Sequence, residues 1–250
     1  MDFRFNTVQE EYILKVKEVA KKLDARPDFD DSNPQHYRDS LKVIASEGLF
    51  QPLIADNTEE MGLSIPIVNA RETFSRYFPF GDFIFAEQAL GIIPILLNGT
   101  AAQKERYLGP LVNGEVIGGF ALTEEASGSD ASSLSCSASK NENGDYVLNG
   151  KKVWISNAPI GDVFIVFART GEHRTKGVTA FIVDGHQSGV TRKQVELSAP
   201  HPIGELIFEN CVINKEQLLG NEGEGFKVAM STMDILRPGV GAHAVGTAKA

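Results

Sequence analysis

The chain changes its hydrophobic period near Gly118, and this change limits the folds open to it. Before that point apolar residues recur at three- and four-residue intervals, as in TVQEEYILKVKEVAKKLDA, which is the spacing of one buried helix face. After it come short runs rich in Val, Ile and Phe, among them DVFIVFART, GVTAFIVDG, GVTRKQVEL and ELIFENCVI. The pattern predicts a helical first part followed by a small antiparallel sandwich or barrel, and not an alternation of strands and helices.

One turn signal and one late helical segment refine this division. The sequence DYVLNGKKVWISN places Asn149-Gly150 between two β-prone runs, which predicts a two-residue hairpin turn. From GNEGEGF onward the composition becomes helical again. We therefore expect an α+β chain with an N-terminal helical domain over 1–117, a middle β-domain over 118–222 and, over 223–250, the first helix of a C-terminal helical bundle.

Charge and composition argue against several classes of function. The formal net charge of -9 repels a phosphate backbone, so we expect no nucleic-acid partner. The two cysteines, Cys136 and Cys211, are too few for a disulfide framework, and the five histidines lack metal-ligand spacing. The apolar run 83–97 is short for a bilayer span, and the N-terminus has no basic region followed by an apolar stretch. These features predict a cytoplasmic, bacterial-type protein without a metal site or a membrane segment.

The stretch GGFALTEEASGSDASSL, which begins at Gly118, holds the densest set of groups suited to a ligand. Gly128 and its small neighbours let the backbone approach a ligand closely, and Thr123 and Ser129 supply hydroxyls. From these residues alone, a polar surface loop and a loop that binds a polar or anionic cofactor are equally supported. The sequence has no G-x-G-x-x-G motif, Walker loop or G-x-S-x-G elbow.

The order of features along the whole chain resembles the acyl-CoA dehydrogenase family. Helices are followed by ALTEEASGSD, an expected hairpin that ends in KVWISN, further strands and LLGNEGEGFKVAMSTMD. Glu125 departs from the family, which usually has Pro there, and this puts the local loop geometry in doubt. The family signature of small, hydroxyl and acidic residues is met in order by Leu122, Thr123, Glu124, Ser127, Gly128, Ser129 and Asp130.

The resemblance implies FAD-dependent α,β-desaturation of an acyl-CoA thioester, and it assigns contact residues by position. It places Trp154 over the flavin ring and Ser156 near the flavin atom that accepts hydride. Arg237 suits a polar thioester arm or phosphate. The plainer interpretations are a core aromatic for Trp154 and a surface pair with Asp234 for Arg237. The implied cofactor contacts are Phe120, Leu122, Thr123, Gly128, Ser129, Trp154, Ile155 and Ser156, and the implied substrate contacts are Ser129, Met233, Asp234 and Arg237.

The resemblance does not supply a general base within this chain. Most members carry a Glu in the C-terminal helical domain, which we expect beyond Ala250. A minority carry it directly before the matching arginine, where this chain has Leu236. We therefore expect a fragment that lacks the base.

Other interpretations stay open. The chain could be a non-catalytic or degenerate subunit that binds FAD or a partner, a member with flavin oxidase or hydroxylase chemistry, or a plain binding module. The resemblance also implies a homotetramer of the full-length protein and an electron-transfer flavoprotein as the acceptor.

Overall fold

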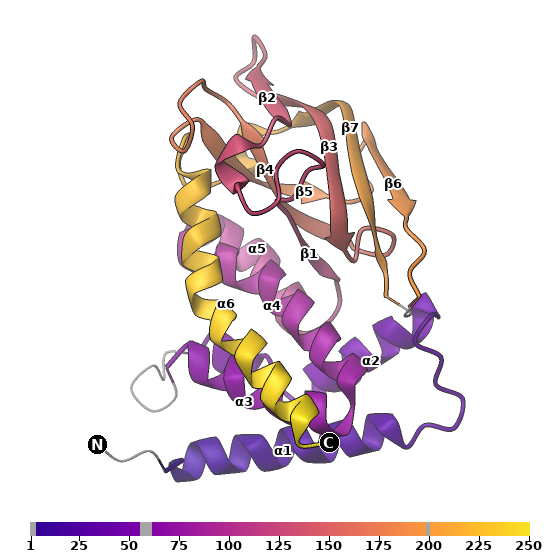
Figure 1. The fold of residues 1–250 in the computed structure, drawn as a ribbon. Coiled ribbons are helices and arrows are strands. Elements are labelled where there is room, and N and C mark those ends of the chain that lie inside the picture. The colour runs from indigo at the N-terminus through magenta and orange to yellow at the C-terminus, as the bar shows by residue number, and fades with distance from the viewer. Residues whose placement is uncertain (1–3, 56–61, 199–200) are drawn as a thin grey trace. The chain divides into compact units, whose positions relative to one another are not determined.

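The computed structural model describes residues 4–55, 62–198 and 201–250, and these fall into two compact units. The helical unit comprises 1–89, 112–115 and 233–250, and the sheet unit comprises 90–111 and 116–232. Figure 1 shows the predicted sequence of elements: helices first, then a β-sheet, then one long C-terminal helix. The helices are α1 Thr7–Asp24, α2 Pro34–Ser46, α3 Ser64–Tyr77, α4 Pro79–Asn98, α5 Ala101–Val112 and α6 Gly225–Ala248.

The first helices begin where the sequence provides caps. Asn6 caps α1 in a reciprocal capping box with Gln9, and Asn33 caps α2, whose first residue is Pro34. The buried faces meet in an aromatic core in which Phe50 stacks on Phe85 with ring centroids 5.0 Å apart. The helical periodicity of the sequence is thus confirmed.

The C-terminal part of α6 is tied into the helical unit by a buried carboxylate. The Asp82 side chain is 4% exposed and accepts hydrogen bonds from Arg71 Nε at 2.8 Å and Nη2 at 3.1 Å. His243 Nδ1 lies 2.9 Å from the second Asp82 oxygen and 2.8 Å from Ser75 Oγ. These contacts join α3, α4 and α6 in one polar cluster.

α4 is longer than the apolar run in the sequence indicates. It extends over 20 residues and passes through Pro94, whose carbonyl accepts a hydrogen bond from Asn98 Nδ2 at 3.1 Å. Among the described residues it is the one helix that is long and apolar enough to cross a membrane by length and composition. However, 67% of its apolar window is buried, as in the core helix of a folded domain.

In the part of the chain that the structure describes, eight strands join in one sheet with the order β6-β7-β3-β2-β4-β5-β8, and β1 pairs with β4. Most neighbours are antiparallel, as predicted, but β1 runs parallel to β4, and β2 meets β4 in a single parallel bridge. The strands are β1 Gly118–Ala121, β2 Ser137–Lys140, β3 Tyr146–Ser156, β4 Val163–Arg169, β5 Val178–Asp184, β6 Val190–Gln194, β7 Ile203–Ile213 and β8 Leu218–Leu219.

The two halves of the sheet share one hydrophobic core. Leu148 from β3, Phe181 from β5 and Phe208 from β7 belong to the same cluster of buried side chains, although β7 and β5 lie far apart in the strand order. The sheet therefore curls around a common interior, and its open curvature can be followed in Figure 1.

The hairpin turn predicted at Asn149-Gly150 is wrong. β3 runs without a break through both residues, and the register against β7 shifts between Leu148 and Gly150. Asn149 Oδ1 accepts a hydrogen bond from Asn210 N on β7 at 2.8 Å, and Gly150 has φ +142. The Asn-Gly pair thus forms a bulge, a structure that also favours glycine.

Gly150→Ala is expected to destabilise the sheet unit by about 1–3 kcal/mol. A Cβ at this position would lie 2.7 Å from the Cys136 Cα, and the positive φ adds backbone strain. Urea unfolding measures the change. Gly109→Ala in α5 is the control, because a Cβ there meets no atom within 4 Å, and it should be neutral or slightly stabilising. Equal urea midpoints for Gly150→Ala and Gly109→Ala would contradict the bulge at Gly150.

Candidate functional site

The end of β1 and the end of β3 lie next to each other in the sheet unit. Val153 N donates to the Thr123 carbonyl at 3.0 Å, and Lys152 Nζ donates to the Leu122 carbonyl at 3.1 Å. The structure therefore brings the residues of ALTEE together with those of WISN, which are about thirty positions apart in the sequence. Phe120, on β1, packs on the Phe167 ring at 4.8 Å between centroids.

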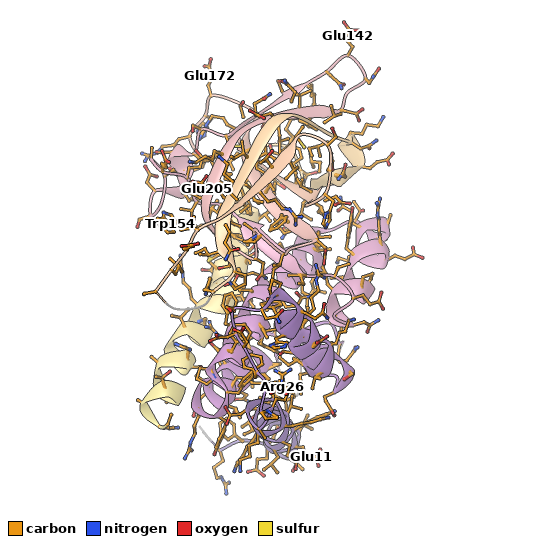
Figure 2. The ribbon with its side chains drawn as sticks, turned by 90° about the vertical axis from the view of Figure 1, so that its right-hand side faces the viewer. Glu11, Arg26, Glu142, Trp154, Glu172 and Glu205 are labelled. Atoms are coloured by element: carbon orange, nitrogen blue, oxygen red, sulfur yellow. The ribbon has the colours of Figure 1, made fainter. Side chains whose placement is uncertain are left out.

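Trp154 has an unusual backbone and an exposed side chain. Its φ is +57, in the left-handed region that bulky residues rarely adopt, and its side chain is 58% exposed. Figure 2 labels Trp154 at the outside of the sheet unit. The core-aromatic interpretation is therefore wrong. Strain at a non-glycine residue costs about 1–3 kcal/mol and is concentrated at functional sites.

Ile155 and Ser156, which follow Trp154, differ in burial and in the groups that they can offer to a ligand. The Ile155 side chain is 2% exposed and belongs to the sheet core, so a ligand contact from this residue can come only from its backbone. Ser156 is half-buried, and its Oγ lies 3.2 Å from His201 Nε2. Sequence reasoning missed His201, which lies 45 positions away along the chain and carries no local motif.

The loop between β1 and β2 exposes some of its small residues and buries others, among them Ser127. Gly128 and Ser129 are exposed, and a Cβ added at Gly128 would meet no atom within 4 Å. Asp130 closes the turn by accepting hydrogen bonds from Ser133 Oγ at 2.5 Å and Ser132 Oγ at 2.7 Å. These bonds, together with an ion pair to Arg174, lower the pKa of Asp130 to about 2. Asp130 thus shapes the loop, and the space beside Gly128 remains open.

The two glutamates of the signature stretch have different partners. Glu124 is buried, and its Oε1 lies 2.7 Å from Nζ of Lys152, whose side chain has no exposed surface. Glu125 is exposed, and it pairs with Lys151 at 3.0 Å. Lys151 also pairs with Glu205 on β7 at 2.9 Å. Glu125, the departure from the expected pattern, thus makes an exposed ion pair, and such pairs add little stability.

The expected substrate contacts on α6 lie in the helical unit. Met233 is half-buried, and Asp234 and Arg237 are exposed and form an i,i+3 ion pair of 3.9 Å. Leu236 is 8% exposed, and it packs inward. The surface pair considered for Arg237 is therefore present, and exposed pairs of this length add little stability.

One hollow in the sheet unit is lined by residues other than those of the signature stretch. It has a volume of about 680 Å³ and is bounded by α5 and by loops near β8, with Arg106, Tyr107, Asp184 and Lys215 among its lining residues. None of the predicted cofactor contacts lines it.

The pH dependence of stability provides a test of the His201 environment. Burial lowers the pKa of His201, so the folded protein favours the neutral ring. The unfolded chain then binds more protons between that lowered pKa and the ordinary value of about 6.5, and stability falls as the pH drops through this window. His201→Gln should show a shallower loss between about pH 7.5 and 5.5 in urea unfolding. If the unfolding free energies of the wild-type protein and of His201→Gln changed in parallel with pH, the buried environment of His201 would be contradicted.

Comparison with known proteins identifies the relationship. The sequence pattern described as "Acyl-CoA dehydrogenase, N-terminal domain" matches residues 7–115, and the one described as "Acyl-CoA dehydrogenase, middle domain" matches residues 119–211. The chain belongs to the acyl-CoA dehydrogenase family. The predicted resemblance is confirmed, and so is the fold: a helical N-terminal domain, a middle β-sheet domain and a C-terminal helix.

Two curated relatives align with nearly the whole chain. The chain is 34% identical over 260 residues to the short-chain specific acyl-CoA dehydrogenase of Megasphaera elsdenii, and it covers 68% of that protein. It is 36% identical over 255 residues to the 3-(aryl)acrylate reductase of Clostridium sporogenes, of which it covers 67%. The alignments include 100% and 98% of this chain. The chain therefore spans about two thirds of the length of these relatives.

Solved structures of the family have the same fold. Butyryl-CoA dehydrogenase from Megasphaera elsdenii superposes with a TM-score of 0.85 at 32% identity, over 98% of this chain and 67% of that chain. A chain of the electron transferring flavoprotein structure of Acidaminococcus fermentans gives 0.88 at 32% identity, over 98% and 66%. An acyl-CoA dehydrogenase from Bacillus anthracis, solved with FAD, gives 0.83 at 31% identity, over 98% and 43%.

Proposed function

We propose that this chain forms the FAD-binding and thioester-binding part of an enzyme that desaturates an acyl-CoA thioester between its α and β carbons. The single observation that carries the proposal is Trp154, a strained and exposed tryptophan beside the Thr123 backbone. Nothing in the packing of the sheet unit requires an indole at this position, because more than half of it faces outward. A bound planar ring that covers the indole would account for both its exposure and its strain.

The residues around Trp154 fit a flavin. The Thr123 and Ser156 side chains are half-buried and supply hydroxyls, and the open backbone at Gly128 admits a ligand where a side chain would otherwise project. When bound, FAD supplies the hydride-accepting chemistry. We propose that it is held by Phe120, Leu122, Thr123, Gly128, Ser129, Trp154, the backbone of Ile155, and Ser156.

The chain's own residues would bind, orient and shield the reactants. Trp154 would exclude water from the ring that it covers, and Ser129 would contact both the cofactor and the thioester arm. Arg237 would bind a polar or phosphate group of CoA, since its long exposed pair with Asp234 is weak enough to exchange. Met233 and Asp234 complete the proposed substrate contacts. Leu236 cannot accept a proton, so the general base is not among the residues that we assign.

The three-domain division, the assembly and the electron acceptor belong to the same proposal. We place the domains at 1–117, 118–222 and 223–250, and we propose a homotetramer that passes electrons to an electron-transfer flavoprotein. The similarity to a chain in the Acidaminococcus fermentans structure supports the acceptor. The short-chain specific relative supports an acyl-CoA substrate in lipid metabolism such as fatty acid oxidation.

Oxidase chemistry is the second candidate, and a relative favours it. The prolyl acyl carrier protein oxidase AnaB superposes with a TM-score of 0.83 at 28% identity. The 3-(aryl)acrylate reductase indicates in addition that a relative can run in the reducing direction.

Flavin bleaching of the full-length protein under nitrogen tests the proposal and separates these reactions. Bleaching by a saturated acyl-CoA, with reduction of an electron-transferring dye and little peroxide in air, supports the dehydrogenase. Rapid peroxide formation in air supports the oxidase. Reoxidation of dithionite-reduced flavin by an acrylate thioester supports the reductase. A protein that takes up FAD but whose flavin responds to no member of an acyl-thioester panel would support a non-catalytic subunit.

A further inference from the structure

Two adjacent lysines on β3 pair with two adjacent glutamates on opposite faces of the strand. Lys151 points outward, where its side chain is 37% exposed and pairs with Glu125. Lys152 points inward, where its side chain is 0% exposed and pairs with Glu124, which is 5% exposed. Neighbouring residues of a strand alternate between its faces, which explains the division. The two pairs have the same chemistry and differ in burial.

The buried pair spans the neck of the loop 123–134, which we call the signature loop. At the C-terminal end of the loop, Glu124 accepts hydrogen bonds from Ser135 N at 2.6 Å, Ser135 Oγ at 2.7 Å and Cys136 N at 2.9 Å. At the N-terminal end, Lys152 Nζ donates to the Leu122 carbonyl at 3.1 Å and to Glu124 Oε1 at 2.7 Å. Both ends of the loop are therefore fastened to β3 through one ammonium and one carboxylate.

The electrostatics of the pair depend on this network. Burial raises the pKa of Glu124, but the Lys152 charge and the hydrogen bonds from Lys152 and Ser135 outweigh it and leave the pKa lowered. Burial lowers the pKa of Lys152, and the neighbouring groups offset part of this effect. Apolar residues of similar size often stabilise a fold as well as a buried ion pair does. Apolar residues cannot donate a hydrogen bond to the Leu122 carbonyl or accept hydrogen bonds from the amides of Ser135 and Cys136.

We infer that the Lys152–Glu124 pair positions the signature loop for its ligand, by locking the loop neck to β3 two residues before Trp154. The inference rests on the proposed function, in which this loop and Trp154 hold the same cofactor. Lys152 and Glu124 are positioning residues, since their polar atoms are occupied by the loop neck. The loop's ligand-facing residues, Thr123, Gly128 and Ser129, lie between the two fastened ends.

The test compares Lys152→Met, the double variant Lys152→Met/Glu124→Gln, and Lys151→Met as the matched control on the same strand. The double variant removes both buried charges and keeps one acceptor oxygen, which can serve Ser135 or Cys136 but not both. Because no buried charge is left without a partner, its fold should be more stable than that of Lys152→Met. The measurements on the full-length protein are amide exchange of the signature loop without FAD, normalised to the amides of β5, and the Kd for FAD. We expect the loop to exchange at least tenfold faster, and FAD to bind at least tenfold more weakly, in both Lys152 variants. In Lys151→Met both should change less than twofold.

Wild-type loop exchange in the double variant would overturn the inference, because the pair would then contribute only stability. Faster exchange with an unchanged Kd for FAD would also overturn it, since the loop order would not serve the ligand. If the wild-type protein binds no FAD, the proposed function fails by itself. The exchange measurement then still decides whether the pair orders the loop.

Discussion

Lys152→Met should lower the free energy of unfolding by about 3–5 kcal/mol. The substitution leaves the Glu124 carboxylate buried without its ammonium partner, and it removes the donor to the Leu122 carbonyl. Removal of one member of a buried pair costs more than the pair contributes, because an uncompensated charge remains in a poorly solvated site. Urea unfolding followed by circular dichroism measures the difference.

Lys151→Met, one residue away, serves as the control for that loss. Its two carboxylate partners are exposed or partly exposed, and such pairs contribute about 0–1 kcal/mol. Sodium chloride should weaken the effect of Lys151 and leave that of Lys152 almost unchanged, since salt screens exposed pairs far more than buried ones. Equal losses of unfolding free energy in Lys151→Met and Lys152→Met would contradict the difference in burial between the two lysines.

Trp154→Gly should change stability and cofactor affinity in opposite directions. Without FAD, glycine relieves the strain of a φ of +57 and removes an exposed indole, so we expect the free energy of unfolding to rise by about 1 kcal/mol. With FAD, the loss of the aromatic face should weaken binding at least tenfold, which corresponds to about 1.4 kcal/mol. Thermal unfolding with and without FAD, together with an FAD titration, measures both effects.

Asn210→Gly is the matched control for the backbone part of this prediction. Asn210 has φ +48 on β7 and pairs with Asn149 at the bulge, away from the signature loop. It should alter stability slightly and leave the Kd for FAD unchanged. If Trp154→Gly destabilised the FAD-free protein by the amount expected for a buried aromatic, Trp154 would be a structural residue and not a ligand contact.

The sequence predicted most of the fold because hydrophobic period and capping residues act locally. The helices before Gly118 and the strands after it appear where expected, whereas the Asn6 and Asn33 caps were not predicted. The hairpin predicted at Asn149-Gly150 is wrong because a bulge favours the same residues as a tight turn. Only the pairing of β3 with β7 distinguishes the bulge from the turn. The parallel pairing of β1 with β4 is likewise a long-range feature with no local signal.

The candidate site was predictable only as far as a family pattern reaches. The pattern indicated Thr123 and Trp154 but not the hydrogen bond from Val153 N to the Thr123 carbonyl. It also did not indicate that Lys152 is buried while Lys151 is partly exposed. Composition does not indicate which of two successive lysines is buried, because the pleat of the strand and the elements packed against it decide this. His201 was missed for a related reason, since its approach to Ser156 depends on the β6–β7 connection.

The fluorescence of Trp154 during an FAD titration tests the central claim most directly. Trp154 is the only tryptophan in these 250 residues and is 58% exposed, so its emission reports on whatever covers it. The proposal predicts that FAD binds to the purified protein and quenches this emission in a saturable way, with a Kd that rises at least tenfold when Thr123→Val and Ser129→Ala are combined. A protein that takes up no FAD, or that binds it while the Trp154 emission stays unchanged, would contradict the account.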